Sequence, residues 1–215
     1  ASQIEVVEPW AEAREALRKN YGIEAQAEAG PALQRAQIVV WAVKPQTFRD
    51  AAAQAKAHTQ GALHLSVAAG IRSDSIAQWL GTERIVRTMP NTPALVGKGM
   101  SALYARPAVS APERQSIEAI MATTGEFLWV DSEPQLDAVT ALSGSGPAYV
   151  FYFLEAMTRA GTGMGLTEQQ AHQLAVGTFV GASELARRSD DPPSVLRQRV
   201  TSKGGTTYAA LQSME

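Results

Sequence analysis

The stretch IVVWAVKPQ, residues 38–46, is an apolar run that ends in a lysine, a proline and a glutamine. A strand covered on both faces of a sheet has such a sequence, because neither of its faces meets water. Pro45 has no N–H to donate to a neighbouring strand and turns the backbone outward, so the strand should end there. The stretch therefore predicts an inner strand of an α/β sheet, with a loop at its carboxyl end.

Further apolar runs and helical patterns alternate on both sides of this strand. Strands are expected at residues 4–7, 62–69, 84–89, 101–105 and 127–130, and helices at residues 11–20, 47–59, 74–80 and 111–124. Two helix starts carry capping signals: Ser73 precedes one helix, and Ser110 forms a capping box with Glu113 at another. Alternation at this spacing predicts a doubly wound, mostly parallel sheet in residues 1–130.

After Val130 only helices are predicted, so residues 131–215 are expected to form an all-helical domain. Its helices should start near residues 132, 147, 167, 194 and 206. The helix at 147–160 is apolar nearly all round, and such a helix is normally buried on several sides. Because so short a domain offers few internal partners, the sequence predicts a homo-oligomer; a self-contained bundle is the alternative.

The composition argues against several classes of function. The 215 residues carry a formal net charge of −2 and no basic cluster, which speaks against a nucleic-acid partner. No cysteine is present and the three histidines are scattered, so neither a disulfide nor a metal site is expected. No apolar run approaches the length of a membrane span, no signal peptide is visible, and the lack of cysteine fits a cytoplasmic location.

Three segments at strand ends are candidates for a nucleotide site, since ligands of open α/β sheets bind beyond the carboxyl ends of the strands. Lys44 follows the first strand, where it faces either a phosphate or solvent. The small side chains of residues 66–70 leave room for a flat ring. Asn91, between Pro90 and Pro93, offers a donor and an acceptor to a carboxamide. Each segment can also be an ordinary turn or a structural loop.

Two glycine-rich segments of the helical part are candidates for substrate contacts. In TSKGGTT, residues 201–207, Gly204 and Gly205 let successive N–H groups converge at a helix start, which suits a small carboxylate. In DAVTALSGSGP, residues 137–147, Thr140 precedes a glycine-rich break and is a candidate to point into the same space. The alternatives are a plain glycine turn for the first segment, and a helix cap with close packing for the second.

The motifs AVKPQ, AAGI, RTMPNTPALVGKGMSAL, DAVTALSGSGPAYVF and TSKGGTT, in this order, resemble the pyrroline-5-carboxylate reductase family over almost the whole chain. The resemblance implies a Rossmann-like N-terminal domain and an all-α C-terminal dimerisation domain. It also implies hydride transfer from NADPH or NADH to L-1-pyrroline-5-carboxylate, which yields L-proline. Family members form homodimers that often assemble further into a decamer-like ring, so the implied partners are the small substrate and other copies of the chain.

The resemblance also assigns roles by position. It implies cofactor contacts by Ala42, Val43, Lys44, Pro45, Ala68, Ala69, Gly70, Asn91 and Pro93, and substrate-carboxylate contacts by Ser202, Gly204, Gly205, Thr206 and Thr207. It places Glu133 near the substrate ring and Thr140 near the imine nitrogen. A hydroxyl or a water at Thr140 would supply or relay the proton that the nitrogen needs.

The sequence departs from the family pattern at several points. The first strand with its phosphate loop is absent and the last helix is cut short, so both domains are expected to be incomplete. Lys203 stands where the family usually has proline. Glu8 can accept a hydrogen bond from a ribose 2′-OH but repels a 2′-phosphate, and together with Ala29 it favours NADH over NADPH.

Two other functions stay open. One is a β-hydroxyacid-type dehydrogenase or another imine reductase, which usually places a catalytic lysine on a helix of the second domain. That domain offers only Lys203, which lies in a loop. The other is a non-catalytic, oligomeric nucleotide-fold scaffold, which the absence of a phosphate loop favours.

Overall fold

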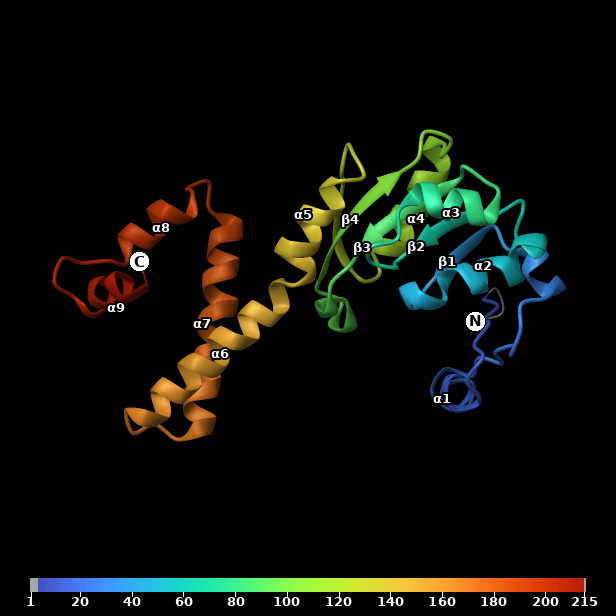
Figure 1. The fold of residues 1–215 in the computed structure, drawn as a ribbon. Helices are drawn as coiled ribbons and strands as arrows, with labels where there is room; N and C mark the ends of the chain where they lie inside the picture. Colours follow the sequence, from blue (N-terminus) through green and yellow to red (C-terminus); the bar gives the residue numbers. More distant parts are fainter. Residues whose placement is uncertain (1–3, 215) are drawn as a thin grey trace. The chain divides into compact units, whose positions relative to one another are not determined.

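The computed structural model describes residues 4–214, which divide into two compact units at Pro147 (Figure 1). Residues 131–147 belong to the first of these units, although the sequence changes in character at Val130. The boundary at residue 130 between two functional domains therefore stays a prediction.

The first unit is built on a five-stranded sheet with its strands in the order β1-β2-β3-β4-β5. The strands are β1 (Ile38–Trp41), β2 (Leu63–Ser66), β3 (Ile85–Met89), β4 (Gly99–Ala105) and β5 (Gly125–Trp129). β1–β2, β2–β3 and β4–β5 pair in parallel, and β3–β4 pair antiparallel. The expected mostly parallel sheet is thus confirmed. The direction reverses between β3 and β4 because the short 3₁₀ helix η4 (Thr92–Val96) takes the place of a crossover helix.

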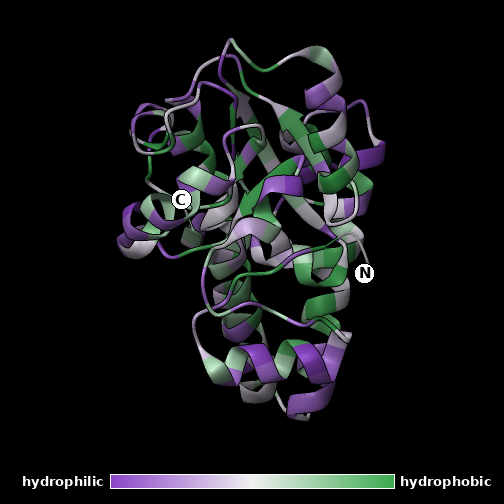
Figure 2. Cartoon of the chain, turned by 90° about the vertical axis from the view of Figure 1, so that its right-hand side faces the viewer, coloured by the Kyte–Doolittle hydropathy of each residue, from purple (hydrophilic) through white to green (hydrophobic). Residues whose placement is uncertain are grey.

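Helices cover both faces of the sheet. α2 (Phe48–Ala55) and α3 (Ser73–Leu80) pack on one face, around Trp41 and Ile85. α4 (Ala111–Met121) packs on the other face, around Leu65 and Leu103. Figure 2 shows the hydrophobic residues along the strands and a mostly hydrophilic α1 (Ala11–Tyr21), none of whose residues is buried. The predicted capping box of Ser110 and Glu113 opens α4 as expected.

In this unit one expected strand is absent and one expected helix is partly 3₁₀; the expected role of Ser73 is corrected below. Residues 4–7 do not form a strand of the sheet, because Val7 makes only one isolated bridge, with Gln26. A single bridge does not propagate into a ladder. The helix expected at residues 47–59 is shorter, since α2 is flanked by the 3₁₀ helices η2 (Pro45–Thr47) and η3 (Lys56–His58). The 3₁₀ helix η1 (Pro31–Arg35) precedes β1.

The first unit ends with α5 (Gln135–Val139), followed directly by the π-helical turn η5 (Thr140–Gly144). Leu136 of α5 is 1% exposed. The side chains of Ile85, Arg87 and Met89 share one face of β3, because side chains alternate along a strand. Arg87 is buried, which is unusual for a cation and requires a partner.

The second unit consists of helices: most of α6 (Gly146–Gly163), then α7 (Glu168–Arg188), α8 (Pro193–Arg199) and α9 (Thr206–Met214). α6 and α7 meet at Gly161, where an added Cβ would lie 2.8 Å from the Cβ of Ala171. Gly161, Ala171 and Ala175 are the buried residues among those described in this unit. Across residues 4–214, no helix is both long and apolar enough to cross a membrane.

Candidate active site

The predicted cofactor-binding loops follow three parallel strands. In the register of the sheet, Trp41 of β1 pairs with Ser66 of β2, and Ser66 pairs with Arg87 of β3. The residues that come next therefore leave the same edge of the sheet, as the carboxyl ends of parallel strands must. They are Ala42, Val43, Lys44 and Pro45 after β1, Ala68, Ala69 and Gly70 after β2, and Asn91 and Pro93 after β3.

The loop after β2 is open enough for the backbone to approach a flat ring. Gly70 has a φ of +75°, and a Cβ added to it would meet no atom within 4 Å. Ala69 and Gly70 are exposed, whereas the side chain of Ala68 is buried and its N–H donates to Ser66 Oγ over 3.3 Å. The loop has the space that the predicted role requires, and cofactor contacts by Ala68, Ala69 and Gly70 stay predictions.

Lys44 and Glu8 both have neighbours near the start of α1. The ammonium group of Lys44 lies 5.5 Å from the ring centre of Trp10, at cation–π distance. The Glu8 carboxylate accepts the N–H of Trp10 over 2.9 Å. Glu8, a half-buried residue, therefore helps to hold the entry into α1.

Asn91 fastens its loop to two other parts of the first unit. Its amide nitrogen donates to the hydroxyl of Ser143 over 3.1 Å, and its amide oxygen accepts the N–H of Met100 over 2.9 Å. Both ends of this side chain are thus engaged with protein. Contact of Asn91 with the carboxamide of a cofactor stays a prediction. The observed hydrogen bonds show that Asn91 holds its own loop in place.

Thr140 opens the π-helical turn η5, a rare local structure that is frequent at functional sites. Its hydroxyl donates to the carbonyl of Leu136 over 2.7 Å, which leaves the oxygen able to accept a hydrogen bond. Gly144 at the end of the turn lies against Met89, since a Cβ there would lie 2.6 Å from Met89 Cε.

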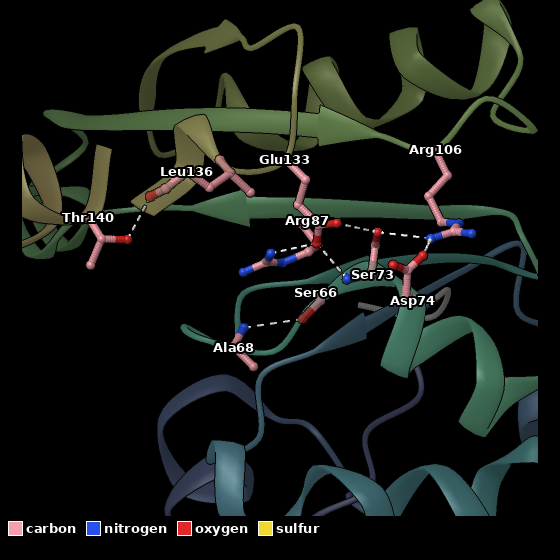
Figure 3. Close-up of polar contacts among 9 residues, drawn as sticks. All are labelled: Ser66, Ala68, Ser73, Asp74, Arg87, Arg106, Glu133, Leu136 and Thr140. Carbon is pink, nitrogen blue, oxygen red and sulfur yellow. Dashed lines mark hydrogen bonds and ion pairs between the residues drawn. The ribbon is translucent and has the colours of Figure 1, made fainter. Parts of the chain in front are cut away.

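Glu133 lies in a network of charged and polar side chains, shown in Figure 3. One carboxylate oxygen accepts the N–H of Ser73 at 2.5 Å and Arg87 Nη1 at 2.6 Å, and the other accepts the Ser73 hydroxyl at 2.8 Å. Arg106 donates to Ser73 Oγ over 3.0 Å and pairs with Asp74 and Glu83. Burial alone would raise the pKa of Glu133, but the Ser73 N–H, the Arg87 guanidinium and the Ser73 hydroxyl hold it below its ordinary value.

This network corrects the expected role of Ser73. α3 begins at Ser73 itself, after Arg72, and the Ser73 hydroxyl donates to Glu133 instead of capping the helix. The carboxylate of Glu133 accepts the first N–H of the helix from a position 60 residues away in the sequence. Sequence reasoning missed Ser73 and Arg87 as partners of Glu133. The arginine inside the apolar run RIVRTM was the signal, because a buried strand cation needs a carboxylate.

The diglycine corner lies in the second unit, before α9. Gly204 has a φ of +75°, which favours glycine, and a Cβ on Gly205 would lie 2.6 Å from Ser202 Oγ, so a side chain there would require Ser202 to shift. The N–H of Gly205 donates to the carbonyl of Ser202 over 3.0 Å. Thr206 and Thr207 are the first residues of α9, and N–H groups there have no carbonyl one turn earlier in the helix. A helix start of this kind can accept an anion, and a carboxylate contact at this corner stays a prediction.

A largely parallel sheet whose loops leave its carboxyl edge, followed in the chain by a helical unit with a glycine-rich corner, is typical of the dinucleotide-binding class of proteins. A family profile described as pyrroline-5-carboxylate reductase dimerisation matches residues 133–215, and one described as NADP oxidoreductase, coenzyme F420-dependent, matches residues 1–70. The chain is 43% identical to pyrroline-5-carboxylate reductase of Pseudomonas aeruginosa, across 100% of the chain and 80% of that protein. The chain belongs to the pyrroline-5-carboxylate reductase family.

Solved structures agree with this assignment. A pyrroline-5-carboxylate reductase from Coxiella burnetii matches with a TM-score of 0.87 and 35% identity, over 98% of this chain and 79% of that one. The Plasmodium falciparum pyrroline carboxylate reductase, solved with NADP bound, matches with a TM-score of 0.84 and 30% identity, over 91% of this chain and 74% of that one. The predicted fold class, a Rossmann-like domain followed by a helical dimerisation domain, is confirmed.

Proposed function

We propose that this protein reduces L-1-pyrroline-5-carboxylate to L-proline with NADH or NADPH, the last step of proline biosynthesis. The observation that carries the proposal is the 43% identity to a reductase of this name along the whole chain. The fold supports it, because three candidate loops leave one edge of the sheet.

The nicotinamide cofactor supplies the hydride when it is bound, and the protein supplies orientation and electrostatics. The loops at Ala42–Pro45, Ala68–Gly70 and Asn91–Pro93 would line it. NADP is bound in the Plasmodium relative, which supports a dinucleotide here. The predicted preference for NADH rests on Ala29 and on Glu8, whose carboxylate would repel a 2′-phosphate.

The substrate carboxylate would bind at the diglycine corner. Backbone N–H groups and the positive end of the α9 dipole favour an anion there. The proposed ligands are Ser202, Gly204, Gly205, Thr206 and Thr207. A Thr207→Val variant should raise the KM for pyrroline-5-carboxylate about tenfold, the effect of one lost charge-assisted hydrogen bond, and leave the cofactor KM unchanged. Loss of both affinities together, or of neither, would count against this role.

Reduction of the C=N bond places the hydride on the carbon and a proton on the nitrogen. We assign the supply or relay of that proton to the hydroxyl of Thr140, directly or through a water. The π-helical turn and the half-buried position of Thr140 support the assignment. Because the hydroxyl hydrogen is donated to the carbonyl of Leu136, the route through a water fits the geometry best, with the Thr140 oxygen accepting a hydrogen bond from the water that delivers the proton. A Thr140→Val protein with an unchanged kcat would contradict it.

The helical unit would join two copies of the chain in a homodimer, and dimers would assemble further into a ring. The match of residues 133–215 to a dimerisation profile supports self-association. A cytoplasmic location remains part of the proposal.

The whole protein should oxidise NADH or NADPH when pyrroline-5-carboxylate is added, and should reduce NAD⁺ with proline at high pH. The assay separates the three candidate functions. Turnover with 3-hydroxy acids but not with proline would favour a β-hydroxyacid dehydrogenase. No turnover with any of these substrates would favour the non-catalytic scaffold.

A further inference from the structure

We propose that Glu133 is a positioning residue, which fixes residues 133–144 along β3 and thereby holds Thr140 at the carboxyl edge of the sheet. The inference rests on the proposed function of Thr140. It deepens that function, because it explains how a side chain outside the sheet obtains a defined place relative to the cofactor loops.

The attachment at Glu133 is buried and uses both carboxylate oxygens. The side chains of Arg87 and Glu133 are 8% and 10% exposed, and their ion pair measures 2.6 Å. The second attachment is to the first turn of α3, through the N–H and the hydroxyl of Ser73. Glu133 is thus tied to a strand and to a helix at once, by charge-assisted hydrogen bonds that are largely shielded from water.

From Glu133 the chain runs along β3 in the direction of that strand. Glu133 bonds to Arg87, Gly144 packs against Met89, and Ser143 accepts a hydrogen bond from Asn91. The partners on β3 and its loop therefore advance toward the carboxyl edge as the segment advances. Leu136 is fully buried and anchors the middle of residues 133–144 in the first unit.

A short series of hydrogen bonds connects Glu133 to Thr140. The N–H of Leu136 donates to the carbonyl of Glu133 over 3.0 Å, and the hydroxyl of Thr140 donates to the carbonyl of Leu136 over 2.7 Å. A shift of Glu133 would therefore move Leu136 and, one turn later, Thr140. Misplacement of a reacting group by 1 Å can cost about 100-fold in rate.

A direct contact between Glu133 and substrate is the alternative role. The carboxylate of Glu133 already accepts hydrogen bonds from three protein donors. These occupy most of its lone pairs and leave little room for a ligand. The two roles differ in what they change: a positioning residue acts on kcat, whereas a substrate ligand acts on KM.

The test compares Glu133→Gln with Glu113→Gln in the whole protein. Glu113 is a matched control, because it also accepts an N–H and a hydroxyl from one serine, Ser110, at a helix start and pairs with an arginine, Arg84. Glu133→Gln should lower kcat about tenfold with both KM values within about twofold, and Glu113→Gln should leave kcat unchanged. A raised substrate KM with normal kcat, or no change in kcat, would overturn the proposal.

Two further measurements keep the test decisive. If Glu133 acts through Thr140, the loss of kcat in Glu133→Gln/Thr140→Val should be smaller than the product of the single losses; independent effects would contradict the proposal. Amide hydrogen exchange of residues 136–144 should speed up in Glu133→Gln but not in Glu113→Gln. Unchanged exchange rules out the tether even if the protein proves not to reduce pyrroline-5-carboxylate, so the two failures are distinguishable. If Glu133→Gln does not fold, Ser73→Ala removes one of the three bonds, and its kcat and exchange should change in the same direction.

Discussion

Phe48 and Ile76 lie fully buried between the sheet and its helices in the first unit, whereas Phe151 and Tyr152 of α6 are 63% and 66% exposed in the second. Both units contain long apolar side chains, but only the first has the layers needed to enclose them. An exposed apolar helix of this kind marks an interaction surface. The difference indicates that the first unit has its own core and that the second obtains much of its burial from another copy of the chain.

The proposed difference between the two units would be contradicted most clearly if the second unit were stable without a partner. Phe151→Asp should convert the assembled protein to monomers, because burial of an aromatic side chain contributes about 1.5–3 kcal/mol and each dimer contains two copies. The expected rise in the dissociation constant is roughly 100-fold or more. Light scattering over a range of concentrations measures it. Tyr21→Asp on α1, where the tyrosine is 69% exposed, is the control and should leave the mass unchanged. A wild-type monomer at micromolar concentration would contradict the comparison.

The core of the first unit is tested by Phe48→Ala. Phe48 is fully buried and its ring centre lies 5.0 Å from that of Trp41. The cavity left behind should cost about 3–5 kcal/mol of unfolding free energy, measured by urea denaturation. Leu95→Ala, at a side chain that is 90% exposed, should cost less than about 0.5 kcal/mol. Equal effects of the two changes would show that the first unit has no rigid core.

Because of His64, the stability of the same core should depend on pH. Burial, together with the charge of Arg84, lowers the pKa of His64 to about 4, while its Nδ1 accepts the indole N–H of Trp41 over 3.0 Å. The unfolded chain titrates at the ordinary value near 6.5, so it takes up the proton first as the pH falls. The stabilisation is therefore complete above about pH 6.5 and is lost as the pH falls toward 4, by about 3 kcal/mol in total.

Urea denaturation of the wild type and of His64→Gln at pH 7 and pH 4.5 checks this dependence. Glutamine can still accept the indole hydrogen bond but does not titrate. The difference in unfolding free energy between the wild type and His64→Gln should fall by about 2–3 kcal/mol from pH 7 to pH 4.5. A difference that is the same at both pH values would contradict the buried neutral state of His64.

The smallest expected effect concerns the cofactor. Replacement of Glu8 by serine removes a carboxylate that would repel a 2′-phosphate and retains a side-chain acceptor for the N–H of Trp10. The ratio of kcat/KM for NADPH to that for NADH should rise about tenfold, which corresponds to about 1.4 kcal/mol. A wild-type protein that already prefers NADPH would contradict the role given to Glu8.

The sequence predicted the elements that depend on local pattern. Apolar runs located β1 to β5, and the capping box at Ser110 located α4. It failed where the outcome depended on distant residues. Residues 4–7 are apolar but find one bridge partner, and Ser73 resembles a cap but the helix start is occupied by Glu133.

Composition and order of residues were enough to determine that this chain forms a sheet domain followed by helices, because burial periodicity and turn residues act within a few positions. They also identified the diglycine corner as a special backbone site, since the positive φ of Gly204 favours glycine. Only the tertiary structure decided which carboxylate neutralises Arg87, and that residues 131–147 pack with the sheet. A buried charge is stable only beside a partner at hydrogen-bond distance, and folding alone brings two residues 46 positions apart to 2.6 Å.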